Sequence, residues 1–269
     1  MDAKAAVFYG YGINCDYETE YALRIAGAQA NRVHIYDVIA NPKMLEEFNL
    51  LAFPGGFSYG DDIGSGKVLA NKMKFKLKEQ IEQFVNEGKL VIGICNGFQI
   101  VVKMGLLPYN DFVQKATLTF NHSGKFEDRW VYLKINQKSP CVFTRDMDEL
   151  MLPVRHGEGK FITDDDTLND LILKNLLVMQ YVNTHNELGA YPYNPNGSML
   201  NIAGICNEKG NVFGLMPHPE AYNTVLNNPF WPNIKNSENY KNYINNTDNL
   251  KGPGIRIFEN AVSYLNERF

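Results

Sequence analysis

A cysteine between two glycines, at the junction of an apolar segment and an amphipathic one, constrains this chain more than any other feature. The apolar segment Leu90–Ile94 predicts a buried strand, and a helix is expected to follow from Asn96. Gly93 and Gly97 leave the backbone on both sides of Cys95 free of side chains, as a sharp strand-to-helix turn requires. The free N–H groups and the positive dipole end of that helix favour a thiolate at the sulfur. The pattern therefore predicts a cysteine nucleophile at the edge of a sheet.

A single free cysteine is more often a small buried core residue, so this interpretation needs support from elsewhere in the chain. The segment Pro217-His218-Pro219-Glu220 supplies it. The two prolines predict extended backbone around His218, and residues two apart on extended backbone point the same way. We therefore expect His218 to be the general base for Cys95, and Glu220 to orient His218.

Attack on an amide also requires N–H donors for the developing oxyanion. One candidate is the backbone N–H of Asn96. The second is an N–H of Gly56 or Phe57, in the turn that follows the apolar strand Leu50–Phe53. On its own, Pro54-Gly55-Gly56 predicts only a tight turn, but loops at the carboxyl ends of neighbouring parallel strands face one pocket.

Composition and charge limit the classes of function. A chain of 269 residues that is 45% hydrophobic can bury a large core. The net charge is −4 and the 26 basic residues are scattered, so no nucleic acid partner is expected. No apolar stretch reaches the roughly 18 residues of a membrane span, and no signal core follows Met1, so we expect no membrane association and a cytoplasmic location.

The cysteines indicate neither a zinc site nor a disulfide framework. The four of them are widely spaced and form no C-x-x-C pair, so we expect reduced thiols and no metal site. They are Cys15, Cys95, Cys141 and Cys206.

The order of apolar and amphipathic segments predicts one α/β domain over residues 1–269, with a mostly parallel twisted sheet flanked by helices. Early strands are expected at Ala3–Tyr9, Val33–Tyr36 and Leu50–Phe53, and helices at Asp16–Ala26, from Asn41-Pro42, and at Lys67–Glu87. The first helix is expected to bring the apolar Tyr21, Ala22, Ile25 and Ala26 to one inner face, and Asn41 is expected to cap the second. Later strands that extend the same sheet are expected at Trp130–Ile135, Leu177–Val182, Asn201–Ile205 and Val212–Leu215. Asn223–Gly254 is expected to be an irregular excursion, followed by a C-terminal helix at Ile255–Asn266.

Two further segments suggest phosphate or metal binding only superficially. Gly60–Val68 resembles a phosphate-binding loop, but Asp61 stands where the first glycine is required and Val68 follows the lysine in place of Ser or Thr. Asp164-Asp165-Asp166 lacks histidines at ligand spacing and is interpreted as a solvated turn.

Several motifs together closely resemble the class I glutamine amidotransferases, which have a flavodoxin-like architecture. They are Gly93-Ile94-Cys95-Asn96-Gly97-Phe98-Gln99, Pro54-Gly55-Gly56-Phe57-Ser58-Tyr59-Gly60-Asp61, Met216-Pro217-His218-Pro219-Glu220, Asn14-Cys15-Asp16, His156-Gly157-Glu158-Gly159 and Asn194-Pro195-Asn196-Gly197-Ser198. The resemblance covers residues 5–221 and continues weakly to the C-terminal helix. Within the family, the second and fifth motifs are typical of the subunit that serves purine biosynthesis.

The resemblance implies hydrolysis of glutamine through a γ-glutamyl thioester on Cys95. The ammonia would pass to a separate synthetase subunit (PurL-like), which amidates formylglycinamide ribonucleotide with ATP, and a small accessory subunit (PurS-like) is a further expected partner. ATP and magnesium are expected on the synthetase, and no cofactor on this chain. The residues expected by analogy to hold the backbone groups of glutamine are Gln99, His156, Gly157 and Glu158.

Two alternatives remain open on the residues. One is a stand-alone cysteine hydrolase or chaperone on a related flavodoxin-like fold, although such proteins generally take their basic residue from elsewhere than a segment like Pro217–Glu220. The other is a binding subunit that has lost activity. Release of glutamate from glutamine distinguishes all three.

Overall fold

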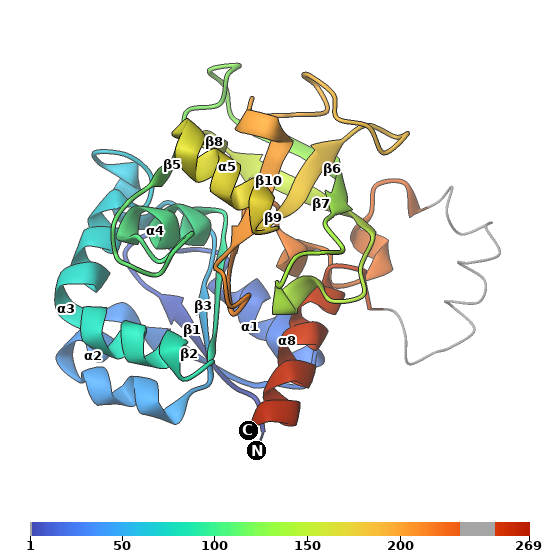
Figure 1. Cartoon of the computed structure of the whole chain (residues 1–269). Helices are drawn as coiled ribbons and strands as arrows, with labels where there is room; N and C mark the ends of the chain where they lie inside the picture. The colour runs from blue at the N-terminus through green and yellow to red at the C-terminus, as the bar shows by residue number, and fades with distance from the viewer. Residues whose placement is uncertain (1, 232–250) are drawn as a thin grey trace.

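The computed structural model describes residues 2–231 and 251–269 and is built around a nine-stranded sheet (Figure 1). The strand order is β2-β1-β3-β4-β11-β10-β9-β6-β7, and β5 and β8 form a separate two-stranded sheet. The strands are β1 (Lys4–Tyr9), β2 (Gln29–His34), β3 (Leu50–Phe53), β4 (Leu90–Ile94), β5 (Ala116–Thr119), β6 (Glu127–Ile135), β7 (Glu149–His156), β8 (Lys160–Thr163), β9 (Leu177–Val182), β10 (Ile202–Cys206) and β11 (Val212–Leu215).

The sheet has a parallel half and an antiparallel half. Strands β2, β1, β3, β4 and β11 run parallel, and β10, β9, β6 and β7 continue the sheet with antiparallel pairings. Every residue of β3 and β4 is buried, which explains their unbroken apolar sequences. The four later strands predicted from the sequence correspond to β6, β9, β10 and β11 and extend the same sheet as expected, whereas β5 and β8 do not join it.

Helices cover the sheet. They are α1 (Asp16–Ile25), α2 (Ile35–Ala40), α3 (Lys67–Asn86), α4 (Asn96–Met104), α5 (Asp165–Leu173) and α8 (Ile255–Arg268), and short 3-10 turns include η1 (Pro42–Glu47), η2 (Ser58–Asp61), η5 (Pro219–Ala221) and η6 (Val225–Asn227). Helix α3 packs against α4, and α1 against α8. Figure 1 shows these two pairs on opposite sides of β1 and β3.

The second strand lies earlier than the sequence pattern predicted. In place of a strand at 33–36, β2 ends at His34 and α2 begins at the next residue. The ring Nδ1 of His34 accepts a hydrogen bond from the N–H of Tyr36 and so caps α2. Strand β2 lies at the sheet edge and contains polar residues, so an apolar pattern could not reveal where it begins.

Two local expectations about helices were wrong, and a third was met in part. A helix does begin at Asn41-Pro42, with Asn41 at the N-cap position, but it is the 3-10 helix η1 and the Asn41 side chain makes no cap bond. Helix α1 buries Ala22 and Leu23, whereas Tyr21, expected on the inner face, is 54% exposed. The acidic run is no turn either, because Asp164 caps α5 by accepting a hydrogen bond from the Thr167 N–H at 2.7 Å.

Most of the expected excursion, residues 232–250, lies outside the described residues. Its two described flanks meet at a β-bridge between Thr224 and Lys251, and the expected C-terminal helix follows as α8. Within residues 2–231 and 251–269, no helix combines the length and the apolar character that crossing a membrane requires.

The first turn of α4 lies unusually close to the sheet, and glycines make this approach possible. A Cβ atom placed on Gly97 would lie 1.8 Å from the carbonyl oxygen of Phe53, and one on Gly93 would lie 2.6 Å from the carbonyl oxygen of Gly97. Both contacts involve backbone atoms of buried elements, which cannot move aside as a flexible side chain can.

We expect Gly97→Ala to lower the free energy of unfolding by about 2–3 kcal/mol, through overpacking of α4 against β3. Gly124→Ala is the control: its φ of +65° adds roughly 1–2 kcal/mol of backbone strain, but nothing among the described residues lies within 4 Å of the new methyl group. Denaturant unfolding measures both. A Gly97→Ala loss no larger than that of the control would show that α4 can move away from the sheet.

Candidate active site

Four loops meet at the carboxyl edge of the parallel strands. The loop after β1 ends at Cys15, the loop after β3 contains Gly55 and Gly56, Cys95 follows β4 directly, and His218 follows β11. These strands are neighbours in the sheet, so residues far apart in sequence come together where ligands of open α/β sheets bind.

Cys95 occupies a strained backbone conformation between β4 and α4. Its φ is 53° and its ψ is −105°, outside the region that a residue with a side chain favours, and this costs of order 1–3 kcal/mol. The N–H of Cys95 donates to the Leu215 carbonyl oxygen at 2.8 Å, which fastens the turn to β11. Cys95 as a residue is 5% exposed, and its thiol points to the Arg155 carbonyl oxygen at 3.5 Å. The predicted sharp turn is confirmed.

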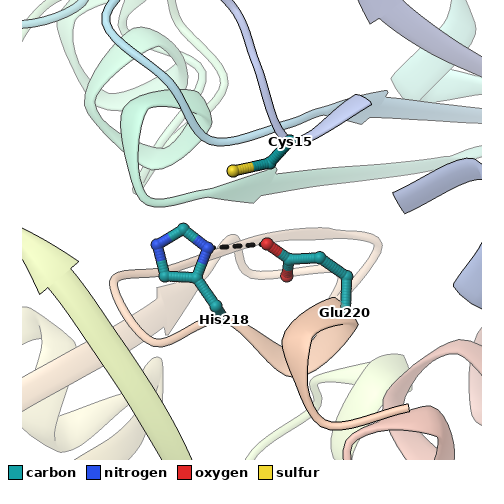
Figure 2. A group of neighbouring side chains, drawn as sticks. All are labelled: Cys15, His218 and Glu220. Carbon is teal, nitrogen blue, oxygen red and sulfur yellow. Dashed lines mark hydrogen bonds and ion pairs between the residues drawn. The ribbon is translucent and has the colours of Figure 1, made fainter. Parts of the chain in front are cut away.

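His218 and Glu220 form a buried pair. Nδ1 of His218 lies 2.6 Å from Oε1 of Glu220, and the residues are 2% and 1% exposed. The pairing was expected, but its geometric reason was wrong: the backbone is extended only at His218, and Glu220 lies in the 3-10 turn η5. The turn brings the carboxylate back beside the imidazole, as Figure 2 shows.

The surroundings of His218 favour its charged form. Burial alone lowers the pKa of the imidazole, but the Glu220 carboxylate and the Cys95 thiol outweigh burial and raise the pKa well above its ordinary value. A Cβ atom on Gly55 would lie 2.8 Å from Cε1 of His218 and 3.5 Å from Cβ of Cys95, so the two side chains flank this glycine. Such an arrangement can hold a thiolate beside an imidazolium.

A cavity of about 110 Å³ opens beside Cys95. It brings together seven residues predicted from the sequence: Gly56, Phe57, Cys95, Gln99, His156, Gly157 and Glu158. His218 and Glu220 are not part of its lining and lie buried behind the thiol. The imidazole is thereby shielded from water, while the Cys95 thiol faces the space that a small ligand can enter.

Polar side chains of α4 hold the cavity walls in place. The Asn96 amide oxygen accepts the Ser58 N–H at 3.1 Å, and the Asn96 amide nitrogen donates to Gln99 Oε1 at 2.8 Å. Gln99 in turn donates through Nε2 to the Glu158 carbonyl oxygen at 2.6 Å. In this structure both polar groups of the Gln99 side chain are therefore used within the protein, and one of them holds the cavity wall at Glu158.

His156 lines the cavity as a neutral residue. Burial, together with the nearby His218, lowers its pKa to about 3. Nδ1 of His156 pairs with Asn121 Oδ1 at 3.0 Å, and the same oxygen accepts the Gly159 N–H at 2.9 Å. Asn121 thus shapes the turn from His156 to Gly159, whereas Nε2 of His156 is buried with no hydrogen-bond partner among the described residues.

The two expected oxyanion donors differ in availability. Asn96 is the first residue of α4, so its N–H has no acceptor within the helix. The Phe57 N–H, in contrast, donates to the Gly12 carbonyl oxygen at 2.9 Å. In this conformation Phe57 is therefore not a free donor, and the loop at Gly56 must change its backbone before the Phe57 N–H can face the thiol.

Sequence reasoning missed several residues of the site. Five further residues line the cavity: Asp61, Ser65, Phe120, Phe126 and Arg155. Asp61 belongs to a motif that was noticed, but Phe120, Phe126 and Arg155 follow no local pattern. A second thiol, that of Cys15, lies beside Cys95 and His218, because a Cβ atom on Gly55 would be only 3.2 Å from its sulfur.

Comparison with known proteins agrees with this geometry. The model of the CobB/CobQ-like glutamine amidotransferase domain matches residues 2–265. Two similar chains are named phosphoribosylformylglycinamidine synthase subunit PurQ: one from Dehalococcoides mccartyi, 46% identical over 95% of both chains, and one from Methanococcus maripaludis, 41% identical over 98% of both. Among solved structures, PurLQS from Thermotoga maritima has a chain with a TM-score of 0.70 and 33% identity, over 98% of this chain and 100% of that one.

The nucleophile turn, the buried His–Glu pair and these similarities define the class of protein as a glutamine amidotransferase. Within that class, the chain belongs to the PurQ family of phosphoribosylformylglycinamidine synthase subunits.

We expect Glu220→Gln to lower the pKa of His218, because an amide oxygen still accepts from Nδ1 but no longer carries the charge that stabilises imidazolium. Titration of the histidine ring signals by NMR measures this, and His156, already neutral, is an internal control that should not titrate near neutral pH. Glutamine hydrolysis should fall less than in His218→Ala. An unchanged pKa would mean that Glu220 does not stabilise the charged ring.

Proposed function

We propose that this chain hydrolyses glutamine to glutamate and ammonia, with Cys95 as nucleophile, His218 as base and Glu220 as the group that orients His218. The ammonia is delivered to a synthetase subunit of the PurL type, which amidates formylglycinamide ribonucleotide with ATP. The observation that carries this proposal is the strained Cys95 turn, which faces a cavity on one side and a buried His–Glu pair on the other.

The reaction follows from the roles of these groups. His218 accepts the Cys95 proton, and the thiolate attacks the side-chain amide carbon of glutamine. N–H groups at the start of α4 stabilise the oxyanion, and His218 returns the proton to the departing ammonia. Water then hydrolyses the thioester to glutamate and regenerates the thiol. The cavity residues His156, Gly157 and Glu158 are proposed to hold the amino-acid end of the substrate.

The proposed partners lie outside this chain. The synthetase subunit holds ATP and magnesium in this proposal, a small subunit of the PurS type completes the complex, and the chain itself needs no cofactor. The names of the relatives and of the structural neighbour support the synthetase partner. A cytoplasmic site of action fits a purine biosynthetic step.

Cys95→Ala should abolish glutamine-dependent synthesis in the assembled complex and spare synthesis from added ammonium. Only the thioester step needs this thiol, and the amidation site lies on another chain. The measurement is product formation with each nitrogen source, in a complex verified by size. Cys141→Ala, which changes a buried thiol outside the cavity, is the matched control and should retain both activities.

Loss of both activities in an intact Cys95→Ala complex would contradict this separation of roles. Release of glutamate by the wild-type protein also tests the alternatives, because neither a chaperone nor a silent binding subunit would produce it.

Glutamine hydrolysis should be slow in the isolated chain and should rise when the synthetase binds. The Phe57 N–H is bonded to Gly12 in this structure, and Gly56, with φ of +149°, is a residue at which the backbone can change at low cost. Glutaminase turnover of the chain alone and with its partner and nucleotide measures the effect. Full turnover alone, unchanged by the partner, would favour a stand-alone hydrolase.

A further inference from the structure

Cys15 lies beside the His–Glu pair without belonging to the proposed triad. It is the N-cap residue that precedes α1, and its N–H donates to the Gly55 carbonyl oxygen at 3.1 Å, which fixes the thiol over this glycine. Figure 2 shows its sulfur directed toward the imidazole of His218. Cys15 is partly exposed, whereas His218 and Glu220 are buried, so its thiol lies between solvent and the pair.

Three atoms of different donor types converge there. One sulfur, one ring nitrogen and one carboxylate oxygen, from Cys15, His218 and Glu220, lie within 4.8 Å of one another. Among the described residues, Nε2 of His218 and Oε2 of Glu220 are also buried without hydrogen-bond partners. The cluster therefore has donor capacity that the surrounding protein does not satisfy.

These donors match the chemistry of a soft divalent cation. Zinc binds thiolate sulfur at about 2.3 Å and imidazole nitrogen or carboxylate oxygen at about 2.0–2.2 Å, usually with four ligands. Ligands around a tetrahedral ion lie roughly 3.6 Å apart. The three atoms lie within 4.8 Å of one another, and Nδ1 of His218 and Oε1 of Glu220 are 2.6 Å apart, so shifts of about 1 Å, inward for the sulfur and outward for that pair, produce this spacing. Cys15 comes from the first loop and the other two from the end of β11, so no local spacing in the sequence could indicate this site.

We propose that Cys15, His218 and Glu220 form an inhibitory site for a divalent cation of the zinc type. The cation replaces the thiol proton of Cys15 and one ring proton of the charged His218, and both protons go to solvent. It then binds the sulfur, one ring nitrogen and one carboxylate oxygen. With the ring ligated, His218 cannot accept the Cys95 proton, so hydrolysis stops until the ion is removed. The inhibition rests on the proposed glutaminase function, whereas binding of the ion does not.

Cobalt(II) tests the binding, because it enters zinc sites and a thiolate ligand gives it a charge-transfer absorption band. The expected result is one ion per chain with this band in wild type and in Cys95→Ala, and loss of the band in Cys15→Ala. Cys141→Ala, a buried thiol outside the cluster, is the control and should keep the band. Glu220→Gln should weaken binding on the order of tenfold or more.

A band that persists in Cys15→Ala and disappears in Cys95→Ala would overturn the proposal, because the ion would then be held by the nucleophile. A band that is lost only in Cys141→Ala would overturn it as well. These outcomes do not depend on whether the chain hydrolyses glutamine.

The second measurement is inhibition of glutaminase turnover by zinc alone, with each variant compared with its own rate in chelator. Wild-type inhibition should reverse on addition of chelator, and Cys15→Ala should need on the order of tenfold more zinc for half inhibition. Equal sensitivity of the two proteins would overturn the inhibitory role. Absence of turnover in metal-free wild type, with the cobalt band present, would instead count against the proposed function alone.

Discussion

The site depends on the close approach of α4 to the carboxyl edge of the sheet. The backbone at Gly97 lies so close to Phe53 that a side chain at position 97 would not fit. The backbone at Gly93 lies close to Gly97 in the same way, so a side chain at position 93 would not fit either. The chain must therefore reverse within one residue between β4 and α4, and that residue is Cys95 at φ of 53°. Backbone strain at a functional residue persists only when tight packing on both sides enforces it.

The same approach organises the rest of the cavity. The first turn of α4 places the Asn96 and Gln99 side chains where one holds the Ser58 backbone and the other holds the Glu158 backbone. Two walls from distant parts of the chain are thereby fastened to the helix that follows Cys95. Behind the thiol, burial and a carboxylate act on His218 in opposite directions, and the carboxylate prevails, which prepares a charged pair in a site closed to water.

Local patterns predicted the elements in which apolar residues coincide with buried positions. Strand β4 was recognised because all of its residues are buried, and α8 because its apolar residues recur at helical spacing and form one buried face. The position of edge strand β2 was predicted incorrectly, because polar residues cover its exposed side. The buried face of α1 was also predicted incorrectly, because the aromatic side chain of Tyr21 is exposed to solvent. The paired strands β5 and β8 are four residues each, too short to give a periodic signal.

By itself, the sequence determined the nucleophile turn, the His–Glu segment and the α/β class, because glycine spacing and apolar runs act through neighbouring residues. Only the tertiary structure decided that Phe120, Phe126 and Arg155 share a cavity with Cys95, that Asn121 holds His156, and that Cys15 faces His218. Those contacts join loops at the ends of strands that are adjacent in the sheet but distant in the chain. Strand order arises from packing of the whole core, and no local sequence pattern encodes it.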